Sequence, residues 1–233
     1  MRAPTDIKID GKTTEWGDKF QAYNVNNHIY YTIANDDDNL YLVIKTNDPV
    51  ANEKAIFGIT FTINLPIENN KKSKNNVSIM FPTVIAVQQR DPIRTAINAL
   101  KSRQKETKDS LLSVVNNKIN NNFKEINVKG INSIQQSTLA INNDYGIKAG
   151  AQIDNDLRYT YELLLPLKYL GSNINSGQKF RYNIKLNGIP QKSPDSPYAA
   201  PMVFPDGGNF LAPDTAFTMY ATDFWCEYVL AKQ

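Results

Sequence analysis

The sequence contains one cysteine and one histidine in 233 residues. A zinc site normally needs three or four Cys, His or carboxylate ligands, and one cysteine can form no intramolecular disulfide. These shortages exclude most metal sites and most nucleophilic catalytic groups. They leave the redox compartment open, because a single cysteine carries no information about it.

The chain also lacks any run of about 18 apolar residues, so the sequence predicts no membrane-spanning helix. Its 26 basic and 23 acidic residues are scattered along the chain. Nucleic-acid-binding domains usually gather their basic residues on one face, so we expect no nucleic-acid partner. No signal peptide begins the chain, since residues 1–4 lead directly into an expected strand. We expect an exported protein whose signal sequence has been removed.

Apolar and polar residues alternate through much of the chain, which is typical of β-strands with one buried face. The clearest hairpin runs from Ile29 to Thr46, with an acidic turn at 36–39. The length of the whole chain allows an all-β sandwich in one domain, residues 1–233. We therefore predict a two-sheet antiparallel β-sandwich, immunoglobulin-like or jelly-roll-like. Other strands are expected near residues 7–9, 20–25, 57–63, 77–81, 123–128, 139–142, 145–153, 157–165, 180–186 and 216–230.

Two stretches interrupt this alternation. Asp91-Pro92 is a good helix start, and apolar residues follow it at helical spacing, so we predict a helical insertion at residues 91–120. The insertion is expected to lie on the sandwich, although its apolar face could bind a protein partner instead. Residues 188–213 hold six prolines and show no period. Long irregular loops are disproportionately functional, so we expect this loop to contribute to a binding site.

Three short motifs, in their order along the chain, resemble the family 9 carbohydrate-binding modules and their DOMON-like relatives. The motifs are Ile9-Asp10-Gly11 with Glu15-Trp16, then Asn35-Asp36 to Asn39-Leu40-Tyr41-Leu42 with Asp48, and Tyr161-Glu162 to Pro166-Leu167 followed by Phe180-Arg181-Tyr182-Asn183.

The resemblance implies a two-sheet sandwich that holds a sugar between aromatic side chains at one end. In this family the late loop often supplies one of the aromatic side chains. The corresponding loop here, residues 188–213, contains no Trp. Tyr198, Phe204 or Phe210 would have to substitute for it. Some members bind calcium, but no ligand set can be carried over to this chain.

An aromatic side chain suits sugar binding because it stacks on the apolar face of a pyranose while polar groups bind the hydroxyls. Trp225 is the best platform by side-chain type, and alternation places it opposite Phe224 and Cys226. The alternative is that both faces of this strand are covered and Trp225 is a core residue. The predicted ligand-binding residues are Trp225, Tyr198, Phe204, Asp206, Asn209 and Phe210, and the alternative for the loop members is a loop held by its own aromatics.

Enzymatic activity is not expected. No spacing pairs Glu162 with a second carboxylate for glycoside hydrolysis. Cys226 and His28 would have to meet to form a nucleophilic pair, and Cys226 is expected to be a small buried apolar residue. Residues 36–39 could bind calcium through carboxylates. An acidic β-turn explains the same residues without a metal, since Asp and Asn favour turns.

The sequence therefore predicts a non-catalytic, monomeric domain that binds a glycan or polysaccharide, with no cofactor assigned. The competing prediction is a structural or adhesion module of an exported protein, without sugar binding.

Overall fold

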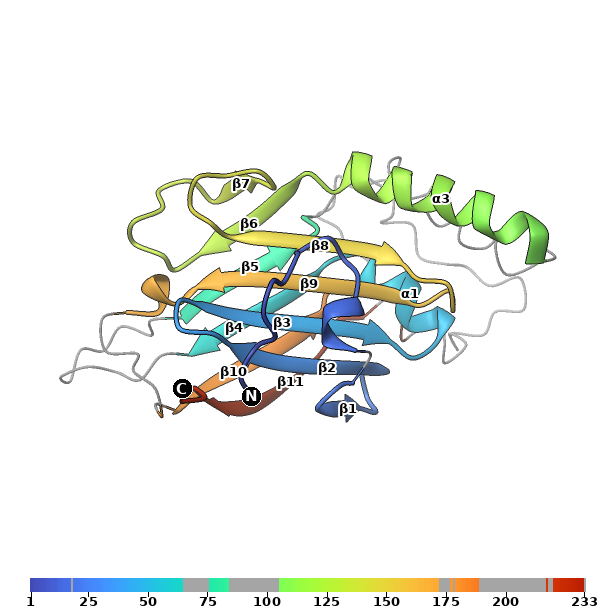
Figure 1. Ribbon diagram of the computed structural model, residues 1–233. Coiled ribbons are helices and arrows are strands. Elements are labelled where there is room, and N and C mark those ends of the chain that lie inside the picture. The colour runs from blue at the N-terminus through green and yellow to red at the C-terminus, as the bar shows by residue number, and fades with distance from the viewer. Residues whose placement is uncertain are drawn as a thin grey trace, which may run out of the picture.

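The computed structural model describes residues 1–17, 19–64, 76–83, 105–171, 177, 179–188, 217 and 220–232. In these residues the strands form two antiparallel sheets packed face to face (Figure 1). The predicted all-β two-sheet sandwich with a helical insertion is confirmed.

The first sheet has five strands in the order β1-β2-β3-β9-β8. The acidic turn joins β2 to β3, and Asp154 to Asp156 form the turn from β8 to β9. The bounds are Ala22–Asn24 for β1, Ile29–Asn35 for β2, Asn39–Thr46 for β3, Tyr159–Pro166 for β9 and Lys148–Ile153 for β8.

The second sheet has six strands in the order β11-β10-β4-β5-β6-β7. Alternation predicted its inner face correctly, because Ile59, Phe61 and Ile63 are buried and their polar neighbours point outward. The bounds are Thr222–Val229 for β11, Lys179–Leu186 for β10, Ile59–Asn64 for β4, Asn76–Phe81 for β5, Glu125–Lys129 for β6 and Thr138–Ala140 for β7.

The N-terminal segment crosses the outer face of the five-stranded sheet (Figure 1). Trp16, in the short 3-10 helix η1 (Thr14–Trp16), packs edge-on against Tyr41 of β3, with ring centres 5.9 Å apart. Ile7 and Ile9 pack beside them. The strand predicted at residues 7–9 is absent, because this segment runs across the sheet instead of pairing along its edge.

Helix α3 (Lys105–Asn122) packs beside β8 and buries Val115 and Ile119 in the core. The side chain of Asn116 exchanges two hydrogen bonds with the backbone of Ile153, at 2.8 and 2.9 Å. These bonds occupy the open edge of β8. Residues 91–104 of the predicted insertion lie outside the described residues, and the described helix extends two residues beyond the predicted end.

Two other helices are short. Helix α1 (Pro49–Ala55) was not predicted, although Asp48 caps it by accepting a hydrogen bond from the Ala51 N–H at 2.8 Å. The 3-10 helix η2 (Leu167–Leu170) follows β9 and ends before Gly171. None of the helices in the described ranges is long and apolar enough to cross a membrane.

Candidate functional site

The outward side of the six-stranded sheet carries most of the polar side chains that face away from the core. Alternation along β4, β5, β10 and β11 places these residues opposite the buried ones. We call this side the polar face; its residues are Thr60, Thr62, Ser78, Met80, Lys179, Arg181, Asn183, Lys185, Asp223, Trp225, Glu227 and Val229.

Trp225 is the large aromatic residue of the polar face. Its side chain is 46% exposed, and its backbone pairs with Asn183 of β10. The guanidinium carbon of Arg181 lies 5.4 Å from the centre of the Trp225 ring, within the range of a cation–π contact. Trp225 is thus an exposed, partly supported aromatic surface, and the core position considered as an alternative is ruled out by its exposure.

Hydrogen bonds hold the polar side chains around Trp225 in place. Asn183 Nδ2 donates to Asp223 Oδ2 at 2.6 Å and to the Phe224 carbonyl at 3.0 Å. Farther across the same sheet face, on β4 and β5, the hydroxyls of Thr62 and Ser78 lie 3.1 Å apart. Side chains that are already ordered lose less conformational freedom when a ligand binds. The polar face is therefore preorganised for polar contacts.

Of the predicted ligand-binding residues, the structure describes Trp225 alone. Tyr198, Phe204, Asp206, Asn209 and Phe210 lie outside the described residues, as does the 188–213 loop beyond Gly188. The sequence reasoning missed Arg181 and Asn183 as neighbours of Trp225. Their proximity depends on the register between β10 and β11, which no local pattern reports.

Cys226 was expected to be buried, and it is exposed. Its side chain does lie on the opposite side of β11 from Trp225, the side that faces Tyr31 and Tyr182. The reason for its exposure is that β11 is the edge strand of its sheet among the described strands, so none of them covers that side. Alternation therefore predicted correctly which side of β11 Cys226 lies on, but the burial expected for that side was wrong.

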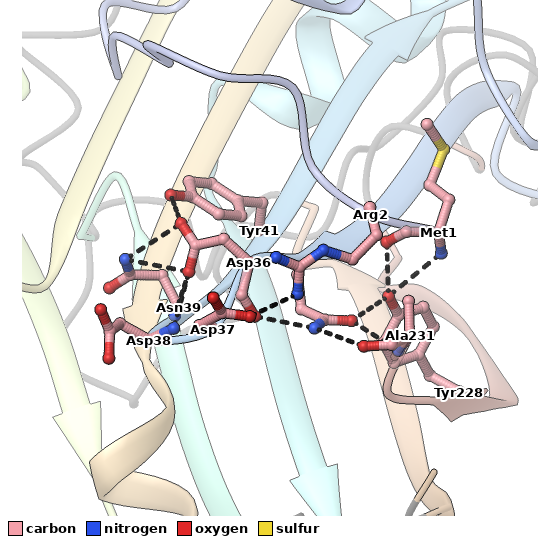
Figure 2. A network of polar contacts seen from close by, with 10 residues as sticks. Met1, Arg2, Asp36, Asp37, Asp38, Asn39, Tyr41, Tyr228 and Ala231 are labelled. Atoms are coloured by element: carbon pink, nitrogen blue, oxygen red, sulfur yellow. Dashed lines mark hydrogen bonds and ion pairs between the residues drawn. The ribbon is translucent and has the colours of Figure 1, made fainter. Parts of the chain in front are cut away.

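The acidic turn is held by its own hydrogen bonds (Figure 2). Asp36 accepts from the backbone N–H groups of Asp38 and Asn39 at 2.8 and 2.6 Å, and from the Tyr41 hydroxyl at 2.6 Å. Burial alone would raise the pKa of Asp36, but these hydrogen bonds outweigh it and lower the pKa. Arg2 forms an ion pair with Asp37 at 2.8 Å.

The same network reaches both ends of the chain (Figure 2). Asn35 Oδ1 accepts from the Tyr228 hydroxyl and from the Ala231 N–H, both at 2.8 Å, and the Met1 carbonyl accepts from Tyr228 at 3.0 Å. The turn is thus a structural junction. Within the described ranges, no three His, Cys, Asp or Glu side chains are placed to hold a metal ion. Calcium binding at residues 36–39 stays the alternative to the acidic β-turn that the sequence favoured.

A cleft of about 550 Å³ lies beside this turn, at one end of the five-stranded sheet. The turn lines one side of it. The rest is lined by residues 144–146, Lys148, the end of β9 at Leu164 and Pro166, and the start of η2. Tyr145 is the aromatic residue of this lining, but its side chain packs partly against the core. The cleft therefore offers less exposed aromatic surface than the polar face does.

The helical insertion was the other candidate binding surface. Its apolar residues Val115 and Ile119 are already buried in the core, and Leu111 and Leu112 pack partly against it. Val114 is the large apolar residue that α3 exposes among the side chains described. The described part of the insertion thus packs on the sandwich, as expected, and binding of a protein partner through this helix stays the untested alternative.

Glu162 joins the N-terminal segment to the five-stranded sheet. It is fully buried on β9 and accepts from Trp16 Nε1 at 2.8 Å and from the N–H groups of Gly11 and Asp10 at 2.9 and 3.1 Å. Burial raises the pKa of Glu162 to about 7, although the three donors favour the carboxylate and act against this rise. The first and third motifs of the resemblance thus meet in space.

Lys54 of α1 is a buried amine near the other end of the sandwich. Its Nζ donates to the Thr222 hydroxyl at 2.7 Å and lies 3.9 Å from the centre of the Phe217 ring. In the part of the chain that the structure describes, no carboxylate forms an ion pair with it. Burial lowers the pKa of Lys54 to about 8.

This lowered pKa predicts a pH dependence of stability. The unfolded chain keeps the Lys54 proton up to its ordinary pKa of 10.5, whereas the folded protein releases it near 8. Between these values the unfolded state binds more protons, so the free energy of unfolding should rise with pH, relative to a Lys54→Met variant. Urea unfolding from pH 7 to pH 11 measures this difference. For a Lys124→Met variant, which removes an exposed lysine, the free energy of unfolding should change with pH as it does in wild type. The same pH dependence in Lys54→Met as in wild type would contradict the prediction.

No protein-family model, curated protein or solved structure matches the chain. The resemblance to family 9 modules therefore stays a prediction.

Proposed function

We propose that the protein is a non-catalytic glycan-binding module and that the polar face is its binding surface. The observation that carries this proposal is the exposed Trp225, flanked by the ordered polar groups of Arg181, Asn183 and Asp223. A pyranose presents an apolar face that stacks on an indole, and hydroxyls that bind such polar groups. One surface thus offers both kinds of contact that a sugar requires.

The proposal differs from the sequence expectation in the position of the site. The resemblance implied a sugar at one end of the sandwich, whereas Trp225 lies within β11 on a sheet face. Strand β11 pairs with β10 over its whole length, from Thr222 to Val229. This pairing gives the platform a rigid base, which favours a shallow, open site for a polysaccharide chain.

A Trp225→Ala variant tests the proposal directly. A glycan array with the purified protein identifies a ligand, and titration calorimetry with that ligand then measures affinity. Loss of a central stacking tryptophan should weaken binding about 30-fold or more. The variant should keep its melting temperature, because Trp225 is largely outside the core.

The matched control is Val114→Ala, which removes a similarly exposed apolar side chain from α3, outside the polar face. It should bind with nearly wild-type affinity. Silence across plant, host and microbial glycans would contradict the proposal, as would undiminished affinity in Trp225→Ala. Either result would favour the competing structural or adhesion module.

A further inference from the structure

The charges that surround Trp225 indicate what kind of glycan fits the polar face. Arg181 and Lys185 lie on β10 two residues before and two residues after Asn183, the residue opposite Trp225. These are the diagonal cross-strand positions, which long side chains can reach. Both cations therefore flank the aromatic platform, one on each side along the strand.

The carboxylates of the same surface are already engaged. Glu227 forms an ion pair with Lys179 at 2.5 Å, and Asp223 accepts the hydrogen bond from Asn183. Among the described residues, no carboxylate forms an ion pair with Arg181 or Lys185. In register, Asp223 lies opposite Lys185 and Glu227 opposite Arg181. Together with Lys179, the surface carries three cations and two carboxylates, so its net charge is positive, even though the formal charges of the protein as a whole nearly balance.

The two cations also suit different parts of one extended ligand. Four residues of strand separate them, roughly 13 Å between their Cα atoms at the usual rise of a β-strand. The planar guanidinium of Arg181 can bind a carboxylate through two parallel hydrogen bonds, while the Lys185 ammonium acts as a point charge. A polymer that carries a carboxylate on successive sugars would contact both.

We propose that the polar face recognises an acidic polysaccharide of the polyuronate class, with Arg181 and Lys185 binding carboxylates on either side of a sugar stacked on Trp225. This inference rests on the proposed glycan-binding function. It adds the charge of the ligand, which the aromatic platform alone does not specify.

The test compares one sugar polymer with and without its charge. Polygalacturonate and alginate are each titrated against their methyl esters, which keep the sugar and remove the carboxylate charge. We expect at least one of the free acids to bind about tenfold or more tightly than its ester, and we expect this preference to weaken with added salt. Arg181→Gln and Lys185→Gln should each lose most of the preference while still binding the ester.

Lys148→Gln is the matched control, because it removes one exposed lysine charge from the five-stranded sheet. It should keep the preference. Equal binding of acid and ester, abolished by Trp225→Ala, would overturn this inference and leave the proposed function standing. If neither polymer bound and a neutral glycan bound at Trp225, this inference would also be overturned and the proposed function would stand. No glycan binding at all would overturn both. Equal affinity for a single-stranded DNA of similar length would show general polyanion binding and overturn the inference.

Discussion

Replacing Glu162 with glutamine is expected to lower the free energy of unfolding by about 3 kcal/mol. Both carboxylate oxygens accept hydrogen bonds, one from Trp16 and the other from the Gly11 and Asp10 N–H groups. Glutamine has the same shape but only one accepting atom. Its NH2 group must face a buried N–H donor, and each buried group left without a partner costs about 1–3 kcal/mol. Chemical unfolding measures the loss.

The pH dependence of this loss is a second readout on the same variant. The pKa of Glu162 is about 7 in the folded protein and lies near 4.5 in the unfolded chain. The folded state therefore keeps the Glu162 proton to higher pH than the unfolded chain does. The contribution of this protonation to the free energy of unfolding is fully present below about pH 4.5 and is lost as the pH rises through about 7. The difference between wild type and Glu162→Gln should be larger at pH 5 than at pH 8.

The control for this prediction is Glu125→Gln, the same substitution at an exposed position on β6. It should change stability by less than about 0.5 kcal/mol. If Glu162→Gln unfolded with the same midpoint as wild type at both pH values, the hydrogen bonds to Glu162 would not hold the N-terminal segment to the sheet.

A Gly11→Ala substitution is expected to cost about 3 kcal/mol, also through the N-terminal segment. Gly11 has φ = +85°, which disfavours any residue with a Cβ. An added Cβ would also lie 2.7 to 2.8 Å from backbone atoms of Ala151. Because backbone cannot move aside as a flexible side chain can, the segment should lift from the sheet. Trp16 would then become accessible to a fluorescence quencher, measured in a Trp225→Phe background so that only Trp16 emits.

Gly17 provides a matched comparison in the same segment. It also has positive φ, +60°, but an added Cβ would meet nothing within 4 Å. Gly17→Ala should therefore cost only the backbone strain, about 1 kcal/mol, without exposing Trp16. Equal losses for the two variants would mean that the close approach to Ala151 contributes nothing.

The fold was largely predictable because period-two alternation reports directly which side of a strand is buried. The strand 57–63 and the strand 180–186 illustrate this, since each kept its predicted inner face. Helix α1 was missed although Asp48-Pro49 has the same start signal as Asp91-Pro92, because its few residues are too short for a helical period. The segment 7–9 was misassigned because alternation alone does not say whether a strand has a partner.

The candidate site was predictable in one residue and not in its surroundings. Side-chain type and parity were enough to single out Trp225 as the best aromatic platform, and its exposure in the structure decided between that position and the core. Arg181, Asn183 and Lys185 are 40 or more positions earlier in the chain, and they meet Trp225 only through the pairing of β10 with β11. Cys226 shows the converse, since its parity was correct but its burial depended on whether another strand lay beyond β11.

The sequence by itself therefore determined most of the strands, their inner faces, the acidic turn and the parity that sets Trp225 opposite Phe224 and Cys226, because local alternation and turn chemistry specify each of them. Tertiary structure alone decided that Glu162 receives the N-terminal segment, that β11 is an edge strand, and that Arg181 and Lys185 flank Trp225. These outcomes depend on sheet order and strand register. Both are set by the packing of residues far apart in the chain, which neighbouring residues do not encode.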